Sequence, residues 1–419
     1  MVHLPAQPDG SGRRAALVLT GGGARGAYQA GALRAIAEIR ADATVPFPIV
    51  SGVSAGAINA AFVALHADDF LRATETLWEL WHGLRTSDVF VTRPGALFRN
   101  GTRLLAELSL GPLLREHRSD YLLDTTPLRD LIVANRSDGA IRRHIVERRL
   151  DAVAVTATDY RSGNAVTFFD TEAPVEPWTR ASRIGVQTQI RPEHVLASAA
   201  LPVFFPPVAI DGRYFGDGGI RLRAPLSTVI HLGATRILAI GTRHPRSEEE
   251  TVEMTRGPVG TETGSAPTRV PTFAEIGGVL LNALLLDGLE VDVERFHRIN
   301  RTLAMLPKEA RARTNLRVIP LTVLRPSADL GELATELLHR VPLPVRHLLK
   351  GLGATDFVGW DLLSYLFFDQ AYTAKLLQLG YDDTIAQRED IERFFSEADP
   401  VDGEGTDRRH IPVGSQSPG

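Results

Sequence analysis

The chain has 419 residues, of which 44% are hydrophobic and 23% are charged, as expected of a globular protein with a sizeable core. Its formal net charge is −4, and its basic residues are scattered rather than clustered, so nucleic-acid binding is not predicted. The chain has no cysteine, which excludes disulfides, thiol catalysis and cysteine-ligated metals.

The N-terminal part of the chain contains two successive units of strand, tight turn and helix. Residues 15–20 form an apolar run that ends in three glycines at 21–23, and a segment with helical composition follows at 27–40. A second apolar run at 46–50 leads into the motif Gly-Val-Ser-Ala-Gly at 52–56 and another helical segment. Consecutive units of this kind predict an α/β fold with a mostly parallel sheet covered by helices.

Further elements are predicted along the chain by the same patterns. Short apolar runs indicate strands at 152–157, 165–169 and 236–241. Helical spacing indicates helices at 69–81 and 127–133.

A β-hairpin is predicted at residues 207–215, because the dipeptide Asp211-Gly212 suits a type I′ turn between two short strands. The second of these strands leads directly into Asp217, which therefore lies on a turn after a strand. The apolar, proline-rich stretch at 201–207 before the hairpin either lines a binding site or is a plain core segment.

Composition also suggests how the chain is divided. We expect a flexible N-terminus at 1–13, an α/β domain at 14–230, a mainly helical region at 231–396 and a disordered tail at 397–419. Within the helical region, residues 244–272 are rich in Pro, Gly, Ser, Thr and Glu and predict a mobile insertion. We hypothesise that this insertion acts as a lid.

The N-terminus and two apolar stretches indicate where in the cell the protein is expected. The first 14 residues include Asp9, Arg13 and Arg14 and lack an apolar core, so they predict no secretory signal, and the cytoplasm is the expected location. The apolar stretches at 277–286 and 357–368 are shorter than the roughly 20 residues that a membrane-spanning helix needs. We expect both to form core helices, with peripheral contact with a membrane as the alternative.

Ser54 is the first candidate catalytic residue. It lies between small residues at a predicted strand-to-helix turn, which is an arrangement that exposes a nucleophilic hydroxyl. Gly52 and Gly56 suit this turn because a side chain at either position would crowd the following helix and a substrate. On this motif alone, an ordinary tight turn explains the residues equally well.

The glycine loop at 21–23 offers donors for an oxyanion. Its backbone N–H groups can turn toward one point, and the N–H of Ala55, directly after Ser54, is the other natural donor. Together with Gly26, the loop also satisfies the dinucleotide-binding pattern G-x-G-x-x-G. That fold would need an acidic residue at the end of the second strand, where Ser54 stands instead. A purely structural turn is a third explanation.

A serine nucleophile needs a base, and three residues are candidates. Histidine is the usual partner, and His194 and His231 are the least implausible histidines by position. Asp217 is better placed, because its turn can point the carboxylate into a cleft; alone, it also suits a turn-stabilising role. A carboxylate with its usual pKa of about 3.9 is a poor base for serine, so burial would have to raise that pKa.

Three motifs together resemble those of the patatin-like phospholipase family. They are Gly-Gly-Gly-Ala-Arg-Gly at 21–26, Gly-Val-Ser-Ala-Gly at 52–56 and Asp-Gly-Gly at 217–219. The resemblance covers roughly residues 14–230, which would then be the catalytic domain. It implies a three-layer α/β sandwich with a mostly parallel central sheet, followed here by a largely helical C-terminal extension.

The resemblance also assigns roles by motif position. It implies that Ser54 is the nucleophile, that Asp217 is the base and that no histidine takes part. Arg25 occupies the family's basic position, where it either contacts a substrate phosphate or pairs with a carboxylate. The implied oxyanion donors are the N–H groups of Gly21, Gly22, Gly23 and Ala55, and the remaining motif glycines are Gly26, Gly52, Gly56, Gly218 and Gly219.

The implied activity is hydrolysis of acyl esters of phospholipids or related acylglycerols through an acyl-enzyme, with no metal or organic cofactor. A lipid ester is the expected partner. Two alternatives stay open on the sequence: a patatin-fold protein that binds lipid or a regulatory partner without turnover, and an α/β-hydrolase that uses a histidine base.

Overall fold

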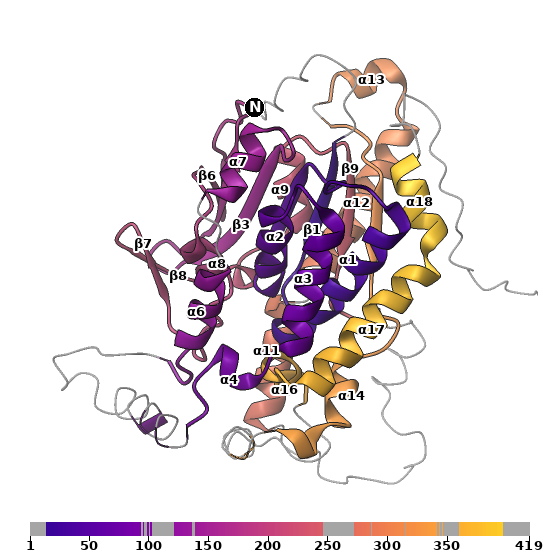
Figure 1. The fold of residues 1–419 in the computed structure, drawn as a ribbon. Coiled ribbons are helices and arrows are strands. Elements are labelled where there is room, and N and C mark those ends of the chain that lie inside the picture. Colours follow the sequence, from indigo (N-terminus) through magenta and orange to yellow (C-terminus); the bar gives the residue numbers. More distant parts are fainter. Residues whose placement is uncertain are drawn as a thin grey trace, which may run out of the picture.

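The computed structural model describes residues 14–93, 121–135, 139–245, 272–285, 287–314, 316–341 and 360–396, with a few single positions between them. The predicted N-terminal segment at 1–13, nearly all of the predicted insertion at 244–272 and the predicted tail at 397–419 lie outside this part. A large twisted sheet forms the middle of the molecule and helices cover it (Figure 1).

The sheet has ten strands, of which eight form the path β10-β9-β1-β2-β3-β4-β6-β5 and two form a hairpin attached to β3. All pairs from β10 to β3 along this path are parallel, whereas β3 and β4 are antiparallel. The strand bounds are β1 Ala15–Leu19, β2 Ile49–Val53, β3 Ala152–Asp159, β4 Ala165–Thr171, β5 Thr179–Arg180, β6 Arg183–Gln187, β7 Val208–Ile210, β8 Arg213–Asp217, β9 Arg236–Ile240 and β10 Leu321–Leu324.

The helices also follow the predicted order in the N-terminal half. They are α1 Gly26–Arg40, α2 Ala55–Leu65, α3 Phe70–Gly83, α4 Thr86–Val89, α6 Thr126–Ala134, α7 Ala140–Val146, α8 Pro192–Ser198 and α9 Pro225–His231. The C-terminal region is mainly helical, with α11 Phe273–Leu285, α12 Asp287–Met305, α13 Lys308–Ala312, α14 Leu330–Thr335, α16 Trp360–Leu366, α17 Gln370–Ala386 and α18 Arg388–Ser396. The predicted fold class is confirmed.

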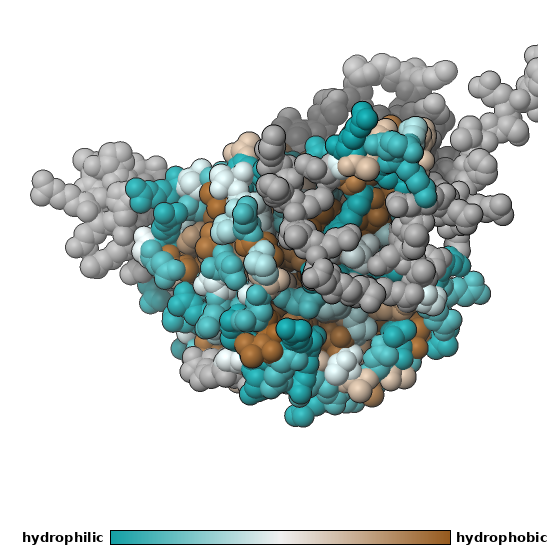
Figure 2. Space-filling view, turned by 90° about the horizontal axis from the view of Figure 1, so that it is seen from above, coloured by the Kyte–Doolittle hydropathy of each residue, from teal (hydrophilic) through white to brown (hydrophobic). Residues whose placement is uncertain are grey.

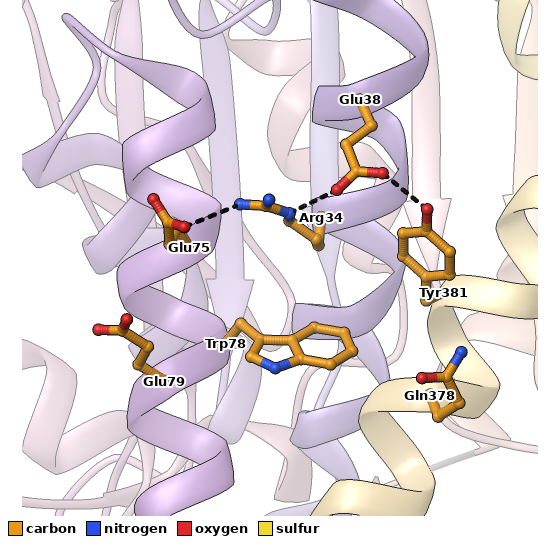
Figure 3. A pocket seen from close by; sticks show the side chains of 7 residues that line it. All are labelled: Arg34, Glu38, Glu75, Trp78, Glu79, Gln378 and Tyr381. Carbon is orange, nitrogen blue, oxygen red and sulfur yellow. Dashed lines mark hydrogen bonds and ion pairs between the residues drawn. The ribbon is translucent and has the colours of Figure 1, made fainter.

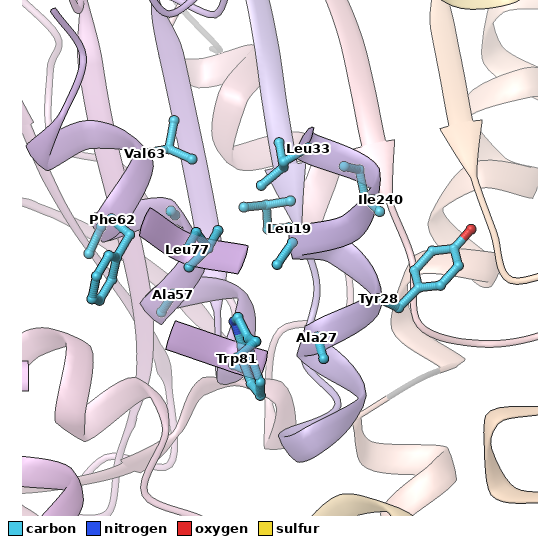
Figure 4. Close-up of a cluster of buried hydrophobic side chains, with 14 of the residues drawn as sticks. Leu19, Ala27, Tyr28, Leu33, Ala57, Phe62, Val63, Leu77, Trp81 and Ile240 are labelled. Carbon is cyan, nitrogen blue, oxygen red and sulfur yellow. The ribbon is translucent and has the colours of Figure 1, made fainter. Parts of the chain in front are cut away.

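Alternating side chains of the central strands supply two hydrophobic cores. Leu17 and Leu19 of β1 point into the core beneath α1, α2, α3 and α17, whereas Ala16 and Val18 point into the core beneath α9 and α12. In the first core, Trp81 of α3 lies close to the sheet-facing side of α1 (Figure 4). Both faces of the parallel strands are therefore covered, as their nearly continuous apolar sequence requires.

The predicted hairpin and the two apolar stretches can be compared with the structure. β7 and β8 pair antiparallel around Asp211 and Gly212, whose φ angles are both positive, as in the predicted turn. The described part of stretch 357–368 is buried from Leu363 onward. Helix α11, by contrast, leaves Val279 68% and Leu280 56% exposed, so it is only partly a core helix.

Figure 2 shows one end of the molecular surface. Seen from the end at which α7 and α13 lie, it consists mostly of hydrophilic residues with small hydrophobic patches between them (Figure 2). Within the part of the chain that the structure describes, no helix combines the length and apolarity that crossing a bilayer requires.

Helices α1 and α17 pack closely because each presents a glycine to the other. A Cβ atom on Gly31 would collide with the carbonyl of Leu377, and one on Gly380 would collide with the carbonyl of Tyr28. Helix α17 is thereby held directly against α1.

We expect Gly31→Ala and Gly380→Ala each to lower the free energy of unfolding by about 1–3 kcal/mol, because overpacking forces two helices apart. Gly277→Ala in α11 is the matched control: its added Cβ meets nothing within 4 Å, so better helix propensity should leave stability equal or higher. Urea unfolding measures all three. Equal stability of Gly31→Ala and wild type would show that the close contact is not a constraint.

Candidate active site

Ser54 lies at the sharp turn between β2 and α2. Its backbone angles, φ 57° and ψ −129°, are strained for a residue with a side chain. The turn needs small neighbours, because a Cβ atom on Gly52 would collide with the carbonyl of Gly56, and one on Gly56 would collide with the carbonyl of Leu19. Ser54 therefore caps the N-terminus of α2, where the helix dipole favours a negative charge.

The hydroxyl of Ser54 donates a hydrogen bond of 2.6 Å to Oδ2 of Asp217, 163 positions further along the chain. β8 brings Asp217 to this place by pairing antiparallel with β3, with Ala157 opposite Asp217. The backbone N–H of Asp217 donates to the carbonyl of Ala200, and its carbonyl accepts from Oγ1 of Thr158, both at 2.8 Å. The carboxylate is thus positioned by the sheet rather than by a free loop.

The environment of Asp217 makes its carboxyl group a stronger base than an exposed aspartate. The residue is 1% exposed, and its Oδ1 accepts from the N–H of Gly219 at 2.8 Å. Burial raises the pKa of Asp217 to about 7, although the hydrogen bonds from Ser54 and Gly219 lower it. Burial and the neighbouring charge of Asp217 also raise the pKa of Tyr160.

Ser198 holds the strained backbone of Ser54. Its Oγ accepts a hydrogen bond of 2.9 Å from the N–H of Ser54 and donates one of 2.6 Å to the carbonyl of Thr156 in β3. Ser198 is completely buried at the end of α8. One hydroxyl therefore connects the turn at Ser54 to the strand beside it.

The glycine loop lies next to Ser54 with its carbonyls bound by the protein. Gly22 and Gly23 have φ angles of 152° and 58°, which glycine adopts without a steric cost. The carbonyl of Gly21 accepts from Oγ1 of Thr242 at 2.6 Å, and the carbonyl of Thr20 accepts from Nε2 of Gln29 at 2.9 Å. These bonds fix the orientation of the peptide groups in the loop.

A buried network of amide side chains supports the same loop. Nδ2 of Asn59 donates to Oε1 of Gln29 at 2.9 Å and to the carbonyl of Gly26 at 3.0 Å. Oδ1 of Asn59 accepts from the indole N–H of Trp81 at 2.8 Å. Gln29 and Asn59 are both fully buried, so their amide groups depend on these partners and rigidify the loop.

An apolar cavity opens beside Ser54. It has about 480 Å³ of empty space, open solvent included, and among its lining residues in the described ranges Ser54 supplies the one side-chain hydroxyl. Gly23 and Ala55 also line it. The rest of the wall is apolar and comes from α2, α3 and the residue after it, α4, α6, the residue after α8, the loop before β7 and the segment after α16: Ile58, Leu80, Trp81, Leu84, Val89, Leu128, Leu131, Ala199, Phe205 and Phe368.

The chain is similar to a known protein family. Residues 17–230 match the family model described as patatin-like phospholipase, which is just over half of the chain. The chain belongs to the patatin-like phospholipase family. The matched region contains both Ser54 and Asp217 together with the glycine loop.

Two solved structures show a distant likeness to this patatin-like chain. The search of curated proteins finds no match. The crystal structure of VipD from Legionella pneumophila is 14% identical with a TM-score of 0.36, and the match covers 91% of this chain and 67% of VipD. The structure of the type III effector protein ExoU is 16% identical with a TM-score of 0.25, covering 90% of this chain and 78% of ExoU.

Arg25, at the basic position of the patatin-like loop, lies beneath α16. Its side chain is buried, its Nε donates to Oγ of Ser364 at 2.8 Å, and its guanidinium lies 4.7 Å from the ring centroid of Tyr365. Arg25 is not part of the wall of the cavity beside Ser54. A contact between Arg25 and a substrate phosphate stays a prediction.

The two candidate histidines pack against other groups. Nδ1 of His194 accepts from the N–H of Arg191 at 3.0 Å, and its ring lies 4.5 Å from that of Phe168. His231 stacks on Trp178 at 4.9 Å. Burial lowers the pKa of each histidine to about 4. The partner that Ser54 has in the structure is Asp217, as the patatin-like motifs predict.

Several residues of the site lie outside the three sequence motifs and are not predicted from the sequence. Gln29 and Asn59 give the best signal, because each is the lone amide of an alanine-rich helix, and Asn59 is also the one polar side chain of α2. Ser198 gives none, since a serine after alanine at a helix end is common. Among the described residues, no cluster of three or more His, Asp or Glu side chains is placed to hold a metal ion.

The buried carboxyl group of Asp217 predicts a pH-dependent stability. Between pH 3.8 and about 7, the folded chain holds a proton at Asp217 that the unfolded chain has released. Because of this group, the free energy of unfolding falls progressively as pH rises through that window. Above the window the group has no further effect on the pH dependence of stability. Asn at this position does not titrate.

We therefore expect Asp217→Asn to gain stability relative to wild type when the pH is raised from about 5 to about 8. Urea unfolding at the two pH values measures this difference. Asp130→Asn on the exposed face of α6 is the control and should follow wild type. A stability difference for Asp217→Asn that does not change with pH would contradict the raised pKa.

Proposed function

We propose that this protein is a serine hydrolase that cleaves acyl esters of phospholipids or related acylglycerols through a dyad of Ser54 and Asp217. The observation that carries the proposal is the 2.6 Å hydrogen bond between the hydroxyl and a buried carboxylate at the end of an apolar cavity. Membership of the patatin-like phospholipase family supports the same reaction class.

In the first step, Oγ of Ser54 attacks the ester carbonyl while Oδ2 of Asp217 takes the hydroxyl proton. This transfer requires Asp217 to be ionised, and with a pKa of about 7 a large fraction is ionised at neutral pH. A base with this pKa accepts the serine proton far more readily than an exposed aspartate does. The positive end of α2 favours the negative charge that develops near Ser54.

Backbone N–H groups would stabilise the oxyanion of the tetrahedral intermediate. Gly23 and Ala55 are the candidates that line the cavity beside Ser54. In other hydrolases, the loss of one such donor costs roughly 2.7–4 kcal/mol in the transition state. The bonds to Gln29 and Thr242 would keep the loop in one conformation, so that little reorganisation is needed during the reaction.

After acting as a base, Asp217 acts as an acid toward the leaving group. The proton that Asp217 accepted passes to the oxygen of the leaving alcohol, and the acyl group stays on Oγ of Ser54. A water molecule then attacks the acyl-enzyme while Asp217 takes one of its protons. As the resulting intermediate collapses, the bond between the acyl carbon and Oγ breaks, Asp217 returns the proton to Oγ of Ser54, and the fatty acid leaves.

The apolar cavity would hold the acyl chain. Its wall combines hydrocarbon side chains with the Ser54 hydroxyl, which matches a fatty-acyl ester in polarity. Phe205, from the proline-rich stretch before the hairpin, is part of this wall. Phe368 extends it from the C-terminal region, where the carbonyl of Phe368 accepts from Oγ1 of Thr86 at 2.9 Å.

A fluorophosphonate probe tests the nucleophile. We expect it to label the wild-type protein and not Ser54→Ala, because only a reactive serine hydroxyl forms the phosphonyl ester. Asp217→Asn should lower both labelling and ester hydrolysis by about 100-fold or more, since the proton acceptor is lost. Mass spectrometry of the labelled chain and turnover of a short-chain ester give the two readings.

The same experiment separates hydrolysis from binding without turnover. Ser162→Ala, in an exposed turn, is the matched control and should label like wild type. Full activity of Asp217→Asn would reject the dyad. Lipid binding by a wild-type protein that neither labels nor hydrolyses any phospholipid, lysophospholipid or triacylglycerol would favour a regulatory role.

The cavity predicts which acyl chains the protein prefers. Phe205→Leu enlarges the wall beside Ser54, so we expect the highest kcat/KM in a series of esters to move toward longer or bulkier acyl groups. Phe62→Leu removes a comparable ring from the same core but outside the cavity wall. This control should keep the wild-type preference even if it is less stable. Identical preferences in all three proteins would argue against the cavity as the acyl site.

A further inference from the structure

A second pocket lies on the other side of α3, between α1, α3 and α17 (Figure 3). It has about 640 Å³ of empty space, including space open to solvent. Each helix contributes residues spaced by three or four positions, which therefore share one face. The wall consists of Arg34 and Glu38 of α1, Glu75, Trp78 and Glu79 of α3, and Gln378 and Tyr381 of α17.

The pocket carries an excess of negative charge. Its wall has three carboxylates and one guanidinium. The guanidinium of Arg34 pairs with Glu38 at 2.8 Å and with Glu75 at 3.8 Å, which leaves two carboxylate charges uncompensated by lining residues. The hydrogen bond from Tyr381 and the pairing with Arg34 lower the pKa of Glu38, so it is ionised at neutral pH.

Two of the six carboxylate oxygens on this wall accept hydrogen bonds. Oε1 of Glu38 accepts from Arg34, and Oε2 accepts from the hydroxyl of Tyr381 at 2.6 Å. Among side chains in the described ranges, Glu79 is the one carboxylate of the pocket with neither an ion pair nor a hydrogen bond. A cationic ligand here finds carboxylate charge that Arg34 does not neutralise.

Two aromatic rings form a corner of the pocket. The rings of Trp78 and Tyr381 are almost perpendicular, with an interplanar angle of 86° and centroids 6.4 Å apart. The indole lies across the middle of the pocket, with Glu79 on one side and Gln378 on the other (Figure 3). Aromatic faces attract cations, and a nearby carboxylate adds to that attraction.

We propose that this pocket binds an alkylated ammonium ion, such as a choline group. A quaternary ammonium ion spreads its charge over methyl groups that pack on aromatic rings, and it donates no hydrogen bonds. It therefore suits a wall with surplus negative charge and two aromatic rings. A primary ammonium ion is more strongly hydrated and has no methyl groups to pack on the rings. The proposal does not depend on the reaction at Ser54.

Fluorine NMR of the full chain labelled with fluorotryptophan tests this site. The chain has four tryptophans, and the signal that disappears in Trp78→Phe identifies Trp78. We expect choline and tetramethylammonium to shift that signal in a saturable way. Dimethylbutanol, the uncharged carbon analogue of choline, should bind at least about fivefold more weakly because it has no cation–π attraction.

Glu79→Gln is the variant that keeps the fold and removes the unengaged charge. It should weaken choline binding about threefold or more, whereas Glu176→Gln, on an exposed loop elsewhere, should bind like wild type. Binding of phosphocholine as strong as that of choline would identify a lipid headgroup as the source, and weaker binding would identify the free cation.

Two results would overturn the proposal. One is the absence of any saturable shift at Trp78 with choline or tetramethylammonium. The other is a stronger response to methylammonium or to an arginine amide than to choline, which would make the pocket a site for a basic side chain. Hydrolysis by Ser54 serves as an independent reading, so failure at this pocket and failure of the proposed reaction are distinguishable.

Discussion

The structure depends on the burial of one carboxyl group, that of Asp217, against the hydroxyl of Ser54. An aspartate this far from water is costly unless its partners are held in place. The protein meets this requirement with strand pairing between β3 and β8, with the N–H of Gly219 and with the bond of Ser198 to the strained turn. The residues around Ser54 and Asp217 are therefore held in place by hydrogen bonds to buried polar groups as well as by close packing.

Much of the fold follows from local sequence. The apolar runs ending at the glycine loop and at Ser54 predict two parallel strands with helices after them, and the structure has β1-α1 and β2-α2 there. Asp211-Gly212 predicts the hairpin turn because few other dipeptides tolerate two positive φ angles. In each case the signal is short-range: a period of apolar residues or a backbone conformation that few residues adopt.

The rest depends on contacts that no local pattern contains. The parallel pairing of β1 with β9 and the antiparallel pairing of β8 with β3 join strands that are far apart along the chain. Exposure of Val279 and Leu280 on α11 depends on which neighbours that helix finds. The three motifs predict that Ser54 and Asp217 act together, but the hydroxyl of Ser198 between Ser54 and β3 follows only from coordinates.

Helix α16 and the residue Phe368 lie outside the region that matches the family model, yet they touch the site. Tyr365 lies against Arg25 of the glycine loop, and Phe368 closes part of the cavity. Divergence in the C-terminal half can thus remodel the chamber next to Ser54 while every signature residue stays unchanged. Two proteins with identical motifs could in this way come to accept different molecules.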